Sequence, residues 1–348
     1  MPVQTIRTRS PLSFQGSRWE FEPGYLEVCA GPWGAERDFC GDVVASWKAA
    51  VDWHADQGLN VMIANIPIAR TDPIYLGWGF HYILDFEGYP HTEDLFSSEF
   101  RKRNIDVLNA IFSHGREKGV LMLAHHFNYF APRRMAVAMG WVPRYPCDEA
   151  DWTDGPAGRV HELKLLVHNC CWNDASYREF LVRCWKETMD ILPDLGGFLV
   201  TPGEGNHGLF DEPAIEAPEG KAHTGSGEYR EHLHHWYQND RRYVETSADF
   251  IKTFDATVRE AGRFPLVRAW AVEGAPHRMP TGPTYLMKHQ LFDCIDAPGD
   301  ALIGKWIDAG HTMWVEAMFS GENSDPIRWA NPGHYRRIGE DIRGSGVQ

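Results

Sequence analysis

The sequence has no long apolar run, no recognisable secretion signal and fewer basic than acidic residues. It contains no stretch of ~18 consecutive apolar residues, so we expect no membrane-spanning helix. The N-terminal MPVQTIRTRSPLSFQG lacks the apolar segment of a signal peptide, which predicts a cytoplasmic protein. The 34 Lys and Arg against 48 Asp and Glu give a formal net charge of -14. This charge would repel a phosphate backbone, so neither nucleic acid nor membrane is an expected partner.

Motifs for disulfides and nucleotides are also missing, and the HxH spacing in HLHH at 232–235 lies in an expected long helix, where solvated or core histidines are expected rather than ligands. The seven cysteines are odd in number and form no CxxC pair, which argues against a disulfide scaffold. No GxGxxG or GxxxxGK[ST] element occurs, so no nucleotide cofactor is expected. Several possible ligands form no HxH, HExxH or CxxC spacing, namely His125, His126, His161, His168, Cys170, Cys171 and His207. We therefore predict neither a metal nor a cofactor.

Aromatic residues are abundant instead. They make up 13% of the chain and include 14 Trp, within an otherwise ordinary globular composition of 43% hydrophobic and 24% charged residues. Trp usually packs a core or lines a ligand cleft. Because sugar-binding clefts use Trp faces heavily, this composition is a first, unspecific indication of a carbohydrate partner.

Short apolar runs alternate with amphipathic stretches along most of the chain. Such an alternation predicts parallel strands joined by helices. The expected strands are 25–30, 60–66, 120–125, 197–201, 265–271, 284–290 and 311–317. The expected helices are 43–57, 99–118, 175–192, 227–261, 298–309 and 332–343.

Seven or eight such units favour a closed (β/α)₈ barrel of the TIM type over an open sheet. We predict one barrel domain over residues 1–348, with the eighth strand uncertain. The segment 161–168 (HELKLLVH) is an alternative source of that strand. We prefer to assign 131–174, which carries Trp141, Trp152 and Trp172, to a long loop on the functional face. A second long loop is expected at 205–226, and both loops should wall the cleft.

Chemically active residues gather where the predicted strands end. Active sites of such barrels lie at the carboxyl ends of the strands. The candidates are His125, His126 and Asn128 on the third strand or after it, Glu204, Asn206 and His207 after the fourth, Arg268, Trp270 and Glu273 on or after the fifth, Lys288 and His289 at the end of the sixth, and Trp314, Glu316 and Glu322 on or after the seventh.

Glu204 and Glu316 are the best candidates for catalysis. Glu204 follows the apolar strand in FLVTPGE, and Glu316 lies inside TMWVEAMF, where an unpaired charge would be costly. Cleavage of a glycosidic bond requires two such groups, one protonated acid and one ionised nucleophile or base. The alternative is that both form structural ion pairs with Arg268 or Lys288.

Two stretches resemble known families. Residues 169–204 (NCCWNDASYREFLVRCWKETMDILPDLGGFLVTPGE) are similar to a segment of α-glucuronidase-type and related barrel glycoside hydrolases, and residues 285–343 are similar in layout to their last strands. In the broad superfamily of retaining barrel glycosidases the acid/base ends strand four and the nucleophile ends strand seven. The resemblance implies these roles for Glu204 and Glu316, although Gly203 stands where that superfamily commonly has Asn.

The remaining candidates are expected to bind substrate. Arg268 and Lys288 could hold a sugar carboxylate or could neutralise the acids, and Trp270 and Trp314 could stack on sugar faces or belong to the core. The leading function is a glycoside hydrolase acting on a plant or algal polysaccharide fragment, with uronic-acid-containing fragments among the expected substrates. Two alternatives are a metal-dependent sugar isomerase or epimerase, with Glu204, Glu273 and a strand-end His as ligands, and a non-catalytic carbohydrate-binding barrel.

Overall fold

The structure is a computed structural model of the whole chain. It describes residues 16–19, 41–56, 58–64, 80, 83–92, 97–126, 130–141, 167–170, 172–202, 241–269, 272, 274–288 and 299–316.

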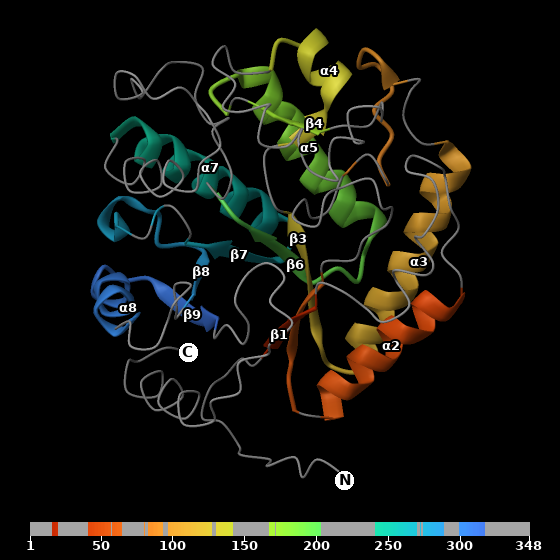
Figure 1. Cartoon of the computed structure of the whole chain (residues 1–348), viewed down its shortest axis with the longest axis horizontal. Helices are drawn as coiled ribbons and strands as arrows, with labels where there is room; N and C mark the ends of the chain where they lie inside the picture. Colours follow the sequence, from red (N-terminus) through yellow and green to blue (C-terminus); the bar gives the residue numbers. More distant parts are fainter. Residues whose placement is uncertain are drawn as a thin grey trace, which may run out of the picture.

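Seven parallel strands form the central sheet (Figure 1). Their order is β1-β2-β3-β6-β7-β8-β9, and each neighbouring pair is parallel. Gly197–Val200 is therefore the fourth strand of the sheet, and Thr312–Glu316 is the seventh. The bounds are β1 Gly16–Trp19, β2 Val61–Ala64, β3 Leu121–His126, β6 Gly197–Val200, β7 Phe264–Arg268, β8 Thr284–Lys288 and β9 Thr312–Glu316.

Helices connect most of these strands and lie around the sheet (Figure 1). They are α2 Gly41–Asp56, α3 Ser98–Glu117, α5 Ala175–Ile191, α7 Arg241–Glu260 and α8 Gly299–Asp308. Two of them begin at capping side chains, since Ser97 accepts a hydrogen bond from the amide of Phe100, and Asp174 accepts from those of Ser176 and Tyr177. This βα alternation confirms an α/β barrel-like fold, while an eighth strand and closure would involve residues outside the described ones.

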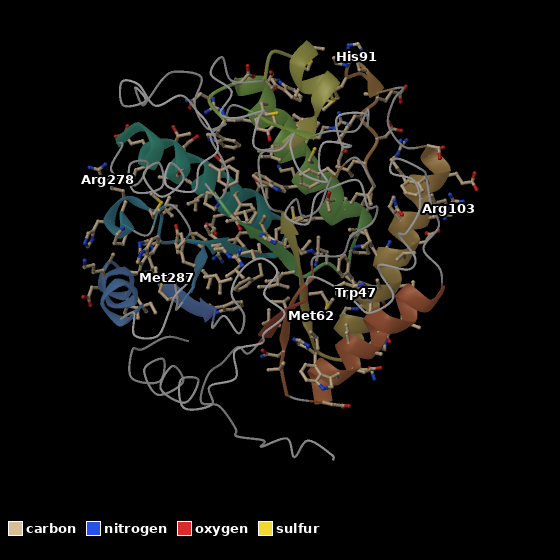
Figure 2. The ribbon with its side chains drawn as sticks, in the orientation of Figure 1. Trp47, Met62, His91, Arg103, Arg278 and Met287 are labelled. Carbon is tan, nitrogen blue, oxygen red and sulfur yellow. The ribbon has the colours of Figure 1, made fainter. Side chains whose placement is uncertain are left out.

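Two hydrophobic clusters lie on opposite faces of the sheet. The larger one joins the outer strand face to the helices, and includes Trp47 of α2, Met62 of β2 and Met287 of β8. Figure 2 shows these three side chains inside the molecule, with His91, Arg103 and Arg278 at its edge. The smaller cluster lies on the inner face and contains residues from β2 to β9. Alternation along each strand separates the two sets, as expected for a sheet buried on both faces.

The predicted loop 131–174 is partly a folded insertion. Strand β4 (Phe130–Pro132) pairs antiparallel with β5 (Val167–Asn169), and helix α4 (Arg133–Ala138) follows β4. The alternative that 161–168 supplies a barrel strand fails for its last two residues, because they pair with β4 outside the main sheet.

Trp141 and Trp172 are core residues of this region, which corrects their expected role in the cleft wall. Both are completely buried. Trp141 packs against Phe180 with ring centroids 4.9 Å apart, and its indole donates a hydrogen bond to Ser176 Oγ at 2.7 Å. The indole of Trp172 donates to Asp249 Oδ2 at 2.9 Å. Neither ring is free to stack on a sugar.

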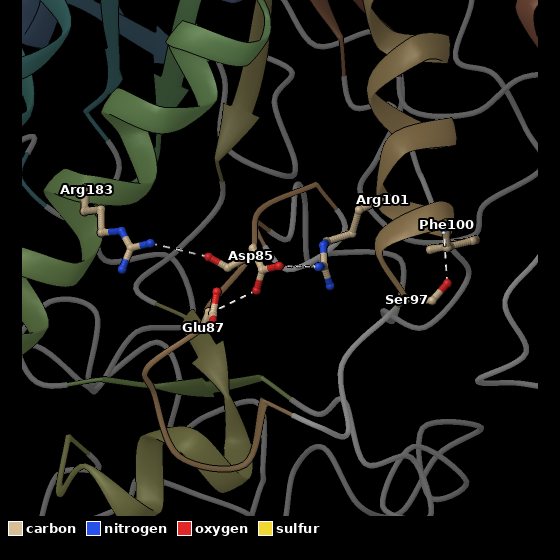
Figure 3. Close-up of polar contacts among 6 residues, drawn as sticks. All are labelled: Asp85, Glu87, Ser97, Phe100, Arg101 and Arg183. Atoms are coloured by element: carbon tan, nitrogen blue, oxygen red, sulfur yellow. Dashed lines mark hydrogen bonds and ion pairs between the residues drawn. The ribbon is translucent and has the colours of Figure 1, made fainter.

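Asp85 ties the segment before α3 to two helices (Figure 3). Its carboxylate accepts hydrogen bonds from Arg101 of α3 at 2.6 Å and from the amide of Glu87 at 3.0 Å. Its carbonyl oxygen accepts from Arg183 of α5 at 3.5 Å. These contacts fix the segment around Asp85 against α3 and α5.

Six of the seven predicted strands are present within three residues of their predicted ends. The strand expected at 25–30 lies outside the described residues, and Gly16–Trp19 lies beside β2. The helix expected at 227–261 is described as α7 from Arg241 onward, and the one at 332–343 lies outside the described residues. Among the described helices, none combines the length and the apolar character that crossing a membrane requires.

Candidate functional site

The inner face of the sheet carries an apolar row that crosses six strands. Ile63, Leu123, Leu199, Leu266, Leu286 and Trp314 each contribute one buried side chain to it. The Trp314 ring stacks on Phe264 with centroids 5.1 Å apart, although β8 lies between their strands. Neighbouring strands are ~4.8 Å apart, so rings two strands apart come into contact most readily across a concave sheet. This row forms the floor of the candidate site.

Every position two residues beyond the floor is polar. Because side chains alternate along a strand, these positions belong to the same inner face, one step nearer the carboxyl ends. Asn65, which follows the floor residue of β2, lies outside the described residues. The other five positions, which we call the polar row, are His125, Thr201, Arg268, Lys288 and Glu316.

Strand pairing brings the members of the polar row close to one another. The Cα atoms of Lys288 and Glu316 are direct register partners on β8 and β9. Val200 pairs with Val267, so Thr201 and Arg268, the next residues, are opposite each other. The candidate nucleophile, a candidate cation and two further polar groups thus start from adjacent strands at one edge of the sheet, the edge where barrel active sites lie.

A buried hydrogen bond joins two members of the row. His125 Nε2 lies 3.0 Å from Thr201 Oγ1, and the exposed fractions of the two residues are 0% and 1%. The bond connects the ends of β3 and β6, three residues before Glu204. His125 is the register partner of the floor residue Leu199, which places it on the inner face. His126, the next residue, pairs with Val200 and therefore takes the opposite face by strand alternation.

Arg268 and Trp314 are more buried than expected for side chains that contact a substrate directly. Arg268 is 1% exposed, so its guanidinium is shielded from solvent. Trp314 belongs to the floor, where one face of its ring is covered by Phe264. A stacking role for Trp314 therefore stays a prediction, limited to whatever part of the ring a ligand could reach.

The other predicted site residues lie outside the described residues. Glu204 is two residues beyond Pro202, the last described residue after β6. Its position is thus fixed in sequence but not in space. The same holds for Asn128, Asn206, His207, Trp270, Glu273, His289 and Glu322.

Sequence reasoning did not single out Thr201 as a site residue. The signal was available, because each strand pattern places one polar residue two positions after an inner apolar one, as in LMLAH, FLVT and LMK. What the sequence could not supply is the register that aligns these positions across strands.

The described residues contain no group of three or more His, Cys, Asp or Glu side chains placed to hold a metal ion. A row of one histidine, one hydroxyl, two cations and one carboxylate can instead donate hydrogen bonds, bind an anion and, through Glu316, supply a nucleophile or base.

No protein-family model matches the sequence, and a search of curated proteins gives no match. Among solved structures the chain resembles a GH138 enzyme targeting pectin rhamnogalacturonan II, with a TM-score of 0.55 and 13% identity over 97% of this chain and 34% of the other. A GH20 β-N-acetylglucosaminidase gives a TM-score of 0.47 at 12% identity, covering 87% of this chain and 52% of the other. A GH20 β-N-acetylhexosaminidase from Streptomyces coelicolor A3(2) gives 0.41 at 13%, covering 78% and 44%.

These structural neighbours are glycoside hydrolases. At 13% identity the first likeness shows the fold alone, and the two lower scores carry no argument. The chain spans about a third of the length of the GH138 enzyme. The resemblance to α-glucuronidases has no counterpart among the three neighbours named here and stays a prediction.

Proposed function

We propose that the protein is a glycoside hydrolase that cleaves a plant or algal polysaccharide or oligosaccharide with two carboxylates. The observation that carries this proposal is the polar row on its apolar floor, at the edge of the sheet where barrel enzymes place their sites. Glu316 of this row acts as nucleophile or base. Glu204, after the fourth strand, acts as the general acid.

The cations of the polar row give a reason why the two carboxyl groups could differ in protonation. Cationic neighbours on the polar row, Arg268 and Lys288, favour the ionised form of Glu316. A general acid needs the opposite environment, less polar or more anionic, so that it stays protonated near neutral pH. Glu204 follows the strand without a cation immediately beside it in the sequence TPGEGN. The two acids are thereby assigned opposite roles.

The cations also favour an acidic substrate. The described polar row carries two cationic residues against one carboxylate, although the whole chain has a net charge of -14. A uronic acid sugar would supply a carboxylate to balance this local excess. The likeness in fold to an enzyme targeting pectin, a plant polysaccharide, agrees with this choice of substrate class.

The proposal includes a closed barrel of eight strands as one domain. The seven described strands already follow the parallel order of such a barrel, with β1 and β9 at its open edges. Residues outside the described ones would supply the last strand. Strand-four and strand-seven placement of the acids favours retention, for which the carboxyl groups should be ~5 to 5.5 Å apart rather than ~6.5 to 9.5 Å.

A screen of 4-nitrophenyl glycosides and glycosiduronic acids tests the proposal on the wild type, Glu204→Gln and Glu316→Gln. Glu316→Gln should lose activity on every substrate. Glu204→Gln should retain the first bond-breaking step on 4-nitrophenyl substrates, because their leaving group needs no proton, and lose hydrolysis of natural oligosaccharides.

Three outcomes would contradict the proposal. Full activity of Glu316→Gln would remove the nucleophile and make Glu273 or Glu322 the next residue to test. Activity lost with a chelator and restored by Mn²⁺ would favour the sugar isomerase. Oligosaccharide binding without any turnover, unchanged in both variants, would favour a binding module.

A further inference from the structure

The two cationic residues of the polar row lie at different depths in the barrel. Inward side chains of such a barrel form layers, and each layer comes from alternate strands. In the observed order, β3, β7 and β9 alternate with β2, β6 and β8. Arg268 on β7 and Lys288 on β8 therefore belong to different layers.

The stagger of the floor shows which layer is deeper. The floor residues of two neighbouring strands are not always register partners. From β3 to β6 the floor moves two residues toward the carboxyl end, because Leu123 pairs with Gly197 rather than with Leu199. The same shift occurs from β7 to β8, where Leu266 pairs with Thr284 rather than with Leu286. The floor does not advance from β6 to β7 or from β8 to β9, where Leu199 pairs with Leu266 and Leu286 with Trp314. The mean advance is about one residue per strand, as in a barrel with eight strands and a shear of 8.

This stagger puts three members of the polar row in one layer directly on the floor. His125, Arg268 and Glu316, on β3, β7 and β9, share the deeper layer. Thr201 and Lys288, on β6 and β8, form the next layer toward the carboxyl ends. The hydrogen bond from His125 to Thr201 crosses from the deeper layer to the outer one.

We propose that Arg268 is a positioning residue that holds Glu316 ionised and oriented, whereas Lys288 contacts the substrate. The proposal rests on the proposed function of Glu316. Arg268 is buried, and a carboxylate at its level would stabilise it, because an isolated buried charge is strongly penalised by desolvation. The planar guanidinium can also donate two hydrogen bonds to one carboxylate and so fix its orientation.

Other charged or titratable groups share the inner face of the sheet with Glu316. His125 is in the same layer, and Lys288 is the register partner of Glu316 in the outer layer. Arg18 of β1 is the register partner of Ile63 and belongs to the same alternate-strand set as β3, β7 and β9. Glu316 is the one carboxylate on the described part of the polar row. A cation near Glu316 favours its ionised form, and the charge of Arg268, which is 1% exposed, is little screened by water.

The test compares Arg268→Gln with Lys288→Gln on the 4-nitrophenyl substrate that the wild type cleaves fastest. The acidic limb of the profile of kcat/KM against pH reports the ionisation of the free enzyme's base. Arg268→Gln should move the acidic limb to higher pH by about 1 to 3 pH units, which is the shift expected for a carboxylate that loses an adjacent arginine. Arg268→Lys, which keeps the charge, should return the limb toward the wild-type position but keep a reduced kcat.

Lys288→Gln is the matched control. It should raise KM for a glycosiduronic acid and shift the acidic limb less than Arg268→Gln does. An equal or larger shift in Lys288→Gln would overturn the assignment of roles, as would an unmoved limb in a folded Arg268→Gln. If Arg268→Gln does not fold, a wild-type acidic limb at or above the ordinary Glu pKa of ~4.3 would still refute the proposal, because an adjacent arginine lowers the pKa of a carboxylate. A full loss of activity in Glu316→Gln together with an unmoved limb refutes this inference alone, whereas an active Glu316→Gln refutes the proposed function.

Discussion

Gly197 begins the central strand β6, and replacing it with alanine should destabilise the protein strongly. Its backbone φ is +155°, which L residues rarely adopt. A Cβ at this position would lie 2.7 Å from the backbone nitrogen of Phe264 and closer still to its carbonyl oxygen. These atoms belong to the paired strand β7, so no flexible side chain can move away.

The expected cost is the sum of two terms. Overpacking costs ~1 to 3 kcal/mol in typical cores, and the upper end applies here because the strand backbone itself must shift. The unfavourable φ adds ~1 to 2 kcal/mol. Gly197→Ala should therefore lower the free energy of unfolding by about 3 to 5 kcal/mol. Because Gly197 also pairs with Leu123, the shift should disturb both neighbouring strands.

Gly304→Ala is the matched control. Gly304 lies in α8, and an added Cβ there meets no atom within 4 Å. Alanine should stabilise the helix by ~0.5 to 1 kcal/mol. Urea unfolding followed by tryptophan fluorescence measures both variants. A Gly197→Ala protein that unfolds at the wild-type urea concentration, with unchanged kcat/KM, would refute the close packing of β6 against β7.

Three further predictions concern buried polar groups. Trp172→Phe removes the hydrogen bond to Asp249 and should cost ~1 to 3 kcal/mol in urea unfolding with KM unchanged, whereas a raised KM would return Trp172 to the cleft wall. Thr201→Val leaves the buried His125 without its hydroxyl partner and should cost a similar ~1 to 3 kcal/mol, while a neutral effect would deny the contact. Burial lowers the pKa of His54 from 6.5 to about 4, so the unfolded chain takes up a proton first as the pH falls. Stability should thus decline between pH 6.5 and pH 4, and His54→Gln should reduce this decline in thermal unfolding measured across that range.

The strands with apolar runs were predictable because burial on both faces requires them. The runs before Thr201 and Arg268 fall within β6 and β7. Gly16–Trp19 was missed because GSRW contains no apolar run, and it forms a strand through its pairing with β2. The short β4–β5 pair was missed for a similar reason, since three-residue strands carry too little periodicity to be recognised.

For the site, the sequence identified residue types but not their depth. His125, Arg268, Lys288 and Glu316 could be named because each is a polar residue inside or at the end of an apolar run. Their common row depends on pairing between strands far apart in the sequence, which no local pattern encodes. The tryptophans show the converse limit, because only the aromatic neighbours of Trp141 and the partner of Trp172 reveal that both are core residues.

The apolar floor has a consequence for how the proposed activity should respond to salt. At physiological ionic strength the screening length is ~8 Å in water, but mobile ions do not enter a packed hydrophobic layer. Salt should therefore readily screen the field of the formal net charge of -14. It should screen the interactions among residues directly on the floor much less. Added NaCl should alter the rate at which a charged substrate reaches the site and leave the pH limits of catalysis nearly in place. The pKa values of the groups on the floor would thus depend little on the salt concentration of the solution that carries the substrate.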